Sequence, residues 1–327
     1  MSAFNAGPEI FVQSVERYLR HHRALGLRYR SVEHALSQLG RHLAKNGASD
    51  LDAMLYESWR RGRSALHSNS RRKTEQIVRR FCLYRRRFEP GFFLPSADAF
   101  SRLRPYVRPV IIEPTQIACM LAEADKLSVH NNSPLRPAVG RIATVLLYTV
   151  GLRSGELRRL RVEDIVDDGT VLHIRESKFH KSRLVPLSES AQAEVQRYLQ
   201  RRAAFAIAST DNGPLLCNRS RRDICPYSAP GFESMIRRLF EAAGVQDREG
   251  RVPRVHDMRH SFAVQALIQS YRKAGDPQAL LPKLALYLGH VSIESTMHYL
   301  KLVPEVAHLA SRRFEAAFGE RVLGGES

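Results

Sequence analysis

The sequence predicts a mainly α-helical protein of two domains with a small β-hairpin or sheet. Apolar residues recur at helical spacing along most of the chain, and only two short stretches have the composition of strands. A run rich in proline and glycine interrupts the helical pattern after residue 90. We therefore expect a helical N-terminal domain over residues 8–90, a linker over 91–113, and a second, mostly helical domain over 114–327.

Four helices are expected in the N-terminal domain. Gly26 ends the first helix, and Ser31 is positioned to cap the second. The third helix is predicted within residues 50–62 and the fourth within 68–88. The fourth helix should turn three apolar side chains inward, namely Ile77, Phe81 and Tyr84.

The fourth helix is also strongly basic. Its cationic side chains lie outside the apolar stripe, so they form either a solvated face or a face that contacts DNA phosphates. Two clusters of arginine on one helix favour DNA. The predicted DNA contacts are Arg71, Arg72, Lys73, Arg79 and Arg80, and Arg85, Arg86 and Arg87 continue the basic series.

Composition narrows the class of protein. The chain has 51 Lys and Arg against 33 Asp and Glu, a net charge of +18, which predicts a polyanionic partner and nucleic acid first of all. The four cysteines form no CxxC pair, so neither a zinc site nor a disulfide framework is expected. No stretch resembles a secretory leader or a membrane span. We expect a soluble cytoplasmic protein, associated with the nucleoid and not with a membrane.

The second domain should start with a helix capped by Thr115. A largely buried apolar segment follows over 140–160. Two strands, 170–177 and 183–188, flank the polar turn "KFHK" and predict a β-hairpin. The remainder is expected to be helical, apart from loops around "TDNGPLLCNRSRRD" and "QDREGRVPR".

The segment "HDMRH" places three chemically capable side chains on one helical face. His256, Arg259 and His260 stand at i, i+3 and i+4, so they project to the same side. Two histidines at this spacing resemble half a zinc site, but an obligate cation lies between them and the HExxH glutamate is missing. This face is therefore expected to bind an anion, and no metal site is predicted.

Other candidate catalytic residues give only weak signals when each is taken alone. Arg153 follows the buried segment, and Glu156 one turn later can hold its guanidinium, although a local salt bridge would look the same. Lys178 lies near the hairpin turn, where lysines are usually inert. His290 follows a glycine and Tyr299 comes nine positions later, where a tyrosine would usually serve packing.

Taken in order, these segments resemble the catalytic motifs of the tyrosine recombinase (phage integrase) family. The matching segments are "VGLRSGEL", "SKFHKSRLVPL", "HDMRH" and "LGHVSIESTMHY", which together cover about residues 115–300. Val150 and Met258 replace a usual threonine and leucine, and His298 directly precedes the tyrosine, but no reactive group is lost. The stretch 261–289 is longer than in chromosome-resolving members and is similar to that of some transposon-encoded recombinases.

The resemblance implies a site-specific DNA recombinase. Such an enzyme cleaves and rejoins strands through a covalent 3′-phosphotyrosine, without metal, ATP or another cofactor, during DNA integration, excision or resolution. Tyr299 is the implied nucleophile, Arg153 and Arg259 would clamp the phosphate, and His256 would accept the tyrosine proton. The remaining roles fall to Lys178, favoured over Lys181, as the acid for the leaving oxygen, to His290 as a phosphate ligand, and to Glu156 and His260 as supporting residues.

The implied partners are double-stranded DNA with specific recombination sites and further copies of the chain. A tetramer on DNA is expected, alone or with other recombinases. The tail carries an apolar helical face over 306–318, which either packs on its own domain or docks on a neighbouring protomer. Two alternatives remain open, a type IB topoisomerase that relaxes DNA and a non-catalytic helical DNA-binding regulator.

Overall fold

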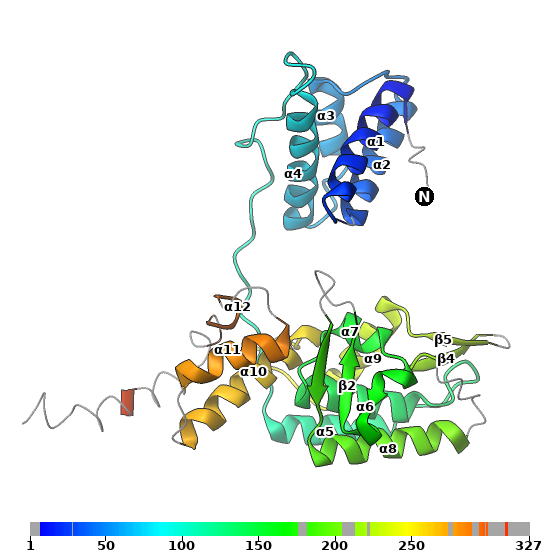
Figure 1. The fold of residues 1–327 in the computed structure, drawn as a ribbon, viewed down its shortest axis with the longest axis vertical. Coiled ribbons are helices and arrows are strands. Elements are labelled where there is room, and N and C mark those ends of the chain that lie inside the picture. Colours follow the sequence, from blue (N-terminus) through cyan, green and yellow to red (C-terminus); the bar gives the residue numbers. More distant parts are fainter. Residues whose placement is uncertain are drawn as a thin grey trace, which may run out of the picture. The chain divides into compact units, whose positions relative to one another are not determined.

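The computed structural model divides into two compact units, Met1–Val107 and Arg108–Ser327 (Figure 1). Both units are mainly helical, and the strands form small antiparallel sheets in the second, which confirms the predicted fold class. None of the helices that the structure describes is long and apolar enough to cross a membrane. The described residues are 7–27, 29–175, 182–204, 213–220, 223–273, 277–289, 294–297, 299 and 311–312.

The first unit is a bundle of four helices around an aromatic core. Phe81 lies at its centre and meets the rings of Phe11 and Tyr18 edge-on, each at 5.6 Å between centroids. Gly26, with φ +81°, ends the first helix as predicted. The helices are α1 (Glu9–Ala24), α2 (Arg30–Lys45), α3 (Ala53–Arg61) and α4 (Ser68–Arg85).

The predicted cap of α2 is wrong. Ser31 lies inside the helix, and the residue before the first turn is Tyr29, which has a left-handed backbone and no capping side-chain hydrogen bond. The Tyr29 ring stacks on His22 of α1 at 4.6 Å, so an aromatic contact between two helices sets this helix start.

The predicted linker is held at both ends. Its early part packs on the first unit, where Glu75 of α4 accepts hydrogen bonds from the backbone and hydroxyl of Ser101 at 2.7 and 2.8 Å. Its end belongs to the second unit, where the Ile112 N–H donates to Ser261 at 2.8 Å. The division between the two units falls within this stretch, after Val107.

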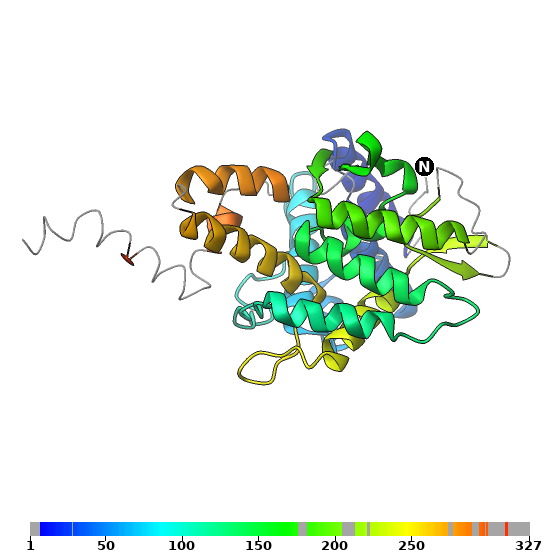
Figure 2. The ribbon, with the colours of Figure 1, turned by 90° about the horizontal axis from the view of Figure 1, so that it is seen from below.

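In the second unit, three helices lie side by side, with α6 between α5 and α8 (Figure 2). The apolar segment 140–160 supplies most of α6 and is buried there, as expected. The helices are α5 (Pro114–Asp125), α6 (Arg136–Thr149), α7 (Ser154–Arg159), α8 (Glu189–Ala204), α9 (Ala229–Ala242), α10 (Val255–Arg272), α11 (Pro277–Leu288) and α12 (Glu294–Met297).

The predicted hairpin is confirmed and belongs to a larger set of strands. Strands β2 and β3 pair antiparallel, with Leu172 opposite Val185 and both side chains buried. A short strand, β1, extends this sheet, and a second hairpin of β4 and β5 lies where a loop was expected. The strands are β1 (Ile165–Val166), β2 (Val171–Ile174), β3 (Arg183–Pro186), β4 (Cys217–Ser220) and β5 (Asp223–Pro226).

Two predictions for the second unit, the loop at β4 and β5 and the cap of α5, are wrong for local reasons. The composition of β4 hides its alternation, because the buried Cys217 is followed by the polar residues Asn218 and Arg219. The start of α5 is capped by Gln116, whose side chain accepts from the Glu113 N–H at 3.0 Å, and not by Thr115. Pro114, at the first helical position, sets this start two residues earlier than predicted.

Gly151 should be intolerant of a side chain. It has φ +64°, and a Cβ atom would lie 2.6 Å from Cδ1 of Phe262 and 3.0 Å from Cδ2 of Leu288. Gly151→Ala should lower the free energy of unfolding by roughly 2–4 kcal/mol, since backbone strain and overpacking add. Gly244 is a matched control, with φ +63° and no neighbour within 4 Å of such a Cβ. Gly244→Ala should cost about 1 kcal/mol, and equal losses in denaturant unfolding would contradict the packing argument.

Candidate active site

A buried carboxylate lies at the centre of the site. Glu156, in the first turn of α7, accepts from Arg153 Nη1 at 2.6 Å and from Arg183 Nη1 and Nη2 at 3.2 and 3.0 Å. Nη1 of Arg259 lies 3.9 Å from the same carboxylate. Burial by itself raises the pKa of Glu156, but hydrogen bonds and charges from Arg183 and Arg153 lower it to about 2. One ionised carboxylate thus holds three guanidinium groups together.

The same three arginines cap the end of α11. A helix leaves its last carbonyl groups without partners, and cations are favourable at that end. The arginines come from a loop, a strand and another helix, so this capping joins distant parts of the chain. The bonds run from Arg183 Nε to Tyr287 O (2.9 Å), Arg259 Nη2 to Leu288 O (2.5 Å) and Arg153 Nη2 to Gly289 O (3.0 Å).

Arg259 is buried without a complete set of partners. Its side chain is 1% exposed, Nη1 donates to Gly151 O at 2.8 Å, and Nε has no hydrogen-bond partner among the described residues. Burial and the charge of Arg153 lower the pKa of Arg259 to about 9, which leaves the group protonated at neutral pH. A desolvated guanidinium with an unused donor is suited to bind an oxyanion.

Helix α10 carries the site on one face and anchors it with the other. The rings of His256 and His260 lie 4.7 Å apart, which places them on one side as predicted. The intervening residues Asp257 and Met258 are buried. Asp257 accepts from the Val110 N–H at 3.3 Å, so the start of α10 is tied to the end of the linker.

Tyr299 contacts the second histidine of the motif. Its hydroxyl lies 3.2 Å from Nδ1 of His260, and the residue is only 2% exposed. Burial, followed by the neighbouring His256, lowers the pKa of His260 to about 4. His256 keeps an exposed edge, and partial desolvation with the charges of Arg259 and Arg153 lowers its pKa as well. Both rings are therefore neutral at neutral pH.

The structure brings together most of the predicted catalytic residues. Lys178 and His290 lie outside the described residues. Arg183 was not predicted as a site residue, although its place in "KSRLVPL", within a quoted motif, was an available signal. In the described part of the chain, no three side chains of His, Cys, Asp or Glu are arranged to hold a metal ion. The residues united around the carboxylate and α10 are Arg153, Glu156, His256, Arg259, His260 and Tyr299.

The basic residues of α4 in the first unit differ in exposure. Lys73 and Arg80 are exposed, whereas Arg72 donates to Ser101 O at 3.2 Å, and Arg71 and Arg79 are half-buried. Arg85 does not belong to the basic face. Its guanidinium is buried and pairs with Asp50 at 2.7 Å and Glu89 at 2.6 Å.

Comparison with known sequences gives a consistent assignment. The model of the phage integrase family matches residues 112–305, which include all the catalytic candidates. An integrase/recombinase of Sinorhizobium fredii, y4rB, is 32% identical over 314 residues, 95% of this chain and 99% of its own. The tyrosine recombinase XerA of Pyrococcus furiosus is 31% identical over 186 residues, 57% of each chain.

Two solved structures share the fold. The integrase of transposon Tn1549, in complex with a circular intermediate DNA, is 18% identical with a TM-score of 0.59, covering 88% of this chain and 93% of its own. The XerH site-specific recombinase, bound to its palindromic difH substrate, is 17% identical with a TM-score of 0.59, covering 97% and 91%. The chain therefore belongs to the phage integrase family, and it is a tyrosine site-specific recombinase.

Proposed function

We propose that this recombinase cuts and reseals DNA at specific sites through a covalent bond between Tyr299 and a 3′ phosphate. The observation that carries the proposal is the grouping of Tyr299 with two neutral histidines next to guanidinium groups fixed by one carboxylate. The phenol oxygen would form a bond to phosphorus as the bond to the 5′ oxygen breaks. A 5′ hydroxyl from another strand can reverse this step without ATP, because the two phosphate esters have similar energies.

The arginines are proposed to stabilise the transition state. Attack on phosphorus increases the negative charge on the non-bridging oxygens, and prearranged donors lower the energy of that charge. Arg259 offers an Nε–H that has no partner among the described residues, in a desolvated position, and Arg153 is a quarter exposed. Their guanidinium forks suit a phosphate better than a lysine ammonium would.

Proton transfer requires an acceptor for the phenol proton and a donor for the leaving oxygen. We retain His256 as the acceptor and assign His260 to position the hydroxyl of Tyr299, since its Nδ1 lies 3.2 Å away. By resemblance to the family, Lys178 would protonate the 5′ oxygen and His290 would hydrogen-bond the phosphate.

The partners follow from the same chemistry. The helical domain over 8–90 is proposed to bind core DNA, with Lys73 and Arg80 as its exposed cations on α4. Recombination between two sites suggests a tetramer on DNA, alone or with other recombinases, and the segment after residue 305 would dock on a neighbouring protomer. The substrate implies action in the cytoplasm at the nucleoid.

Tyr299→Phe should abolish covalent DNA complexes without weakening DNA binding, since only the nucleophilic oxygen is lost. Gel shifts measure binding, and denaturing gels measure trapping on nicked suicide duplexes drawn from the chain's own genomic neighbourhood. Wild-type relaxation of supercoiled plasmids that lack such sites would favour the topoisomerase alternative. Covalent trapping by Tyr299→Phe would show that another residue is the nucleophile.

His260→Phe should slow covalent complex formation by about tenfold to a hundredfold, because the hydroxyl of Tyr299 loses its hydrogen bond to His260 Nδ1. His260→Asn should restore most of the rate, since the Asn Oδ1 can replace Nδ1 as an acceptor. The wild-type rate should fall as the pH approaches about 4, where His260 becomes protonated, and His260→Asn should lack this component. Equal rates for Phe and Asn would contradict a positioning role.

Glu156→Gln tests the carboxylate that holds the arginines. The folded pKa of about 2 lies below the ordinary 4.5, so ionised Glu156 contributes roughly 3 kcal/mol to the free energy of unfolding at neutral pH. That contribution is complete above about pH 4.5 and disappears as the pH falls through about 2. The stability gap between wild type and Glu156→Gln should therefore close over this range.

Glu241 provides the control for this prediction. It forms an exposed pair with Arg237 at 2.9 Å, so Glu241→Gln should cost less than about 1 kcal/mol. Denaturant unfolding at a series of pH values measures both variants. A Glu156→Gln deficit that stays constant down to pH 2 would refute the ionic explanation.

A further inference from the structure

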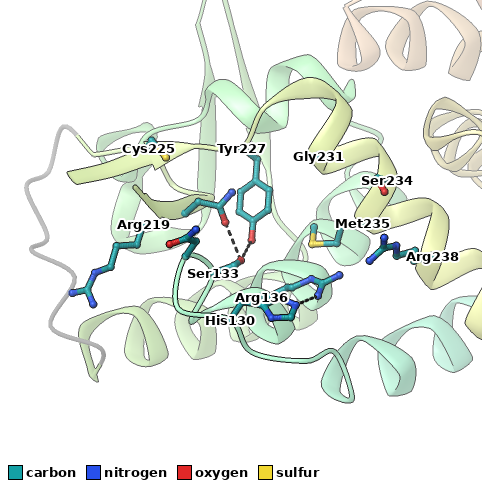
Figure 3. Close-up of a pocket in the computed structure, with 12 residues that line it drawn as sticks. His130, Ser133, Arg136, Arg219, Cys225, Tyr227, Gly231, Ser234, Met235 and Arg238 are labelled. Atoms are coloured by element: carbon teal, nitrogen blue, oxygen red, sulfur yellow. Dashed lines mark hydrogen bonds between the residues drawn. The ribbon is translucent and has the colours of Figure 1, made fainter. Parts of the chain in front are cut away.

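A second cluster of cationic side chains lies in a surface pocket of the second unit. The pocket has a volume of about 530 Å³ and is formed by the loop before α6, the β4–β5 hairpin and α9 (Figure 3). Among the described residues, its lining includes His130, Arg136, Arg219 and Arg238 but no aspartate or glutamate. None of the lining residues belongs to the candidate active site.

The side chains of two of these arginines have no hydrogen-bond or ion-pair partner among the described residues. The side chains of Arg219 and Arg238 are exposed and make no hydrogen bond or ion pair within the part of the chain that the structure describes. They lie at opposite sides of the pocket in Figure 3. Arg237, the neighbour of Arg238 on α9, is instead paired with Glu241. The pocket therefore concentrates uncompensated positive charge.

Arg136 contacts a neutral histidine, not an acid. Its Nη1 lies 2.8 Å from Nε2 of His130 (Figure 3). Because a guanidinium can only donate, Nε2 must accept, and the His130 ring carries its proton on the other nitrogen. The guanidinium of Arg136 keeps its full charge beside the two unpaired arginines.

A hydrogen-bonded chain of Tyr227, Ser133 and Asn218 leaves the amide nitrogen of Asn218 as a further donor in the pocket. Ser133 Oγ donates to Asn218 Oδ1 at 2.9 Å, so the single Ser133 proton is used and the Tyr227 hydroxyl must donate to Ser133 at 2.7 Å. Burial raises the pKa of Tyr227, which keeps that proton in place. The Asn218 amide nitrogen has no partner among the described residues and can donate to a ligand.

The wall of the pocket is fixed relative to the candidate active site. Arg158 of α7 donates to Tyr227 O at 3.1 Å, and α7 is the helix that carries Glu156. On the other side, the Arg219 N–H donates to Asn132 O at 2.8 Å, which joins β4 to the loop before α6. A ligand in the pocket would thus be held at a defined distance from the arginine cluster.

We infer that this pocket binds one phosphate of the DNA backbone, away from the phosphate that is cleaved. The inference rests on the proposed function, because DNA is the ligand. A lining of arginines and neutral donors without carboxylates among the described residues matches phosphate oxygens. Such a contact adds affinity for any sequence and keeps the duplex in register with the active site.

The test compares two adjacent arginines of α9 in the full-length protein. Arg238→Ala should weaken binding to a random-sequence duplex about tenfold at low salt and reduce the slope of log Kd against log salt concentration by about one. Arg237→Ala, which removes an arginine already paired with Glu241, should leave both values unchanged. Fluorescence anisotropy over a salt series measures them.

Other outcomes would overturn the inference. Equal losses in both variants would indicate diffuse surface charge, and no loss in Arg238→Ala would show that DNA does not reach the pocket. Inorganic phosphate that raises the melting temperature of wild type but not of Arg238→Ala, without any change in DNA binding, would identify a small-anion site. Formation of the Tyr299 covalent complex is measured separately at saturating DNA, so failure here leaves the proposed function intact.

Discussion

The ionised carboxylate of Glu156 is the interaction on which the rest of the site depends. Three guanidinium groups would repel one another in a desolvated space, and a single buried carboxylate holds two of them by direct bonds and the third at 3.9 Å. The same arginines then occupy the last carbonyl groups of α11, so the chain just before His290 is drawn to the cluster. Burial of Glu156 costs free energy, and its arginine partners offset that cost.

Helix α10 connects the arginine cluster to Tyr299, the proposed nucleophile, because it carries both Arg259 and His260. One side of the helix carries His256, Arg259 and His260, while Asp257 and Ser261 accept hydrogen bonds from the incoming chain at Val110 and Ile112. Tyr299 lies in a small apolar core made with α10 and α11, which explains its low exposure. The phenol is thus placed by packing, and its hydroxyl lies within hydrogen-bond distance of His260.

The protein uses its positive charge in two different ways. Arg259 is buried, partly unsatisfied and fixed by backbone carbonyl groups, which suits it to charge that develops during the reaction. Lys73 of the first unit and Arg238 of the second are exposed, which suits them to backbone contacts whose strength falls with salt. Arg85 shows that counting the arginines in a sequence cluster overestimates the number of DNA contacts. An arginine held between two carboxylates stabilises the fold instead.

The sequence by itself determined what depends on local spacing: helical periodicity, the β2–β3 hairpin, the shared face of His256 and His260, and the pairing of Arg153 with Glu156 three residues later. Residue order also identified the family. Tertiary structure decided what joins distant segments, as when Arg183 reaches Glu156 across 27 positions and Tyr299 reaches His260 across 39. It also decided the capping of α11, since a helix end shows in the sequence but its partners do not. Spacing along one element fixes directions, whereas contacts between elements depend on how their buried faces pack.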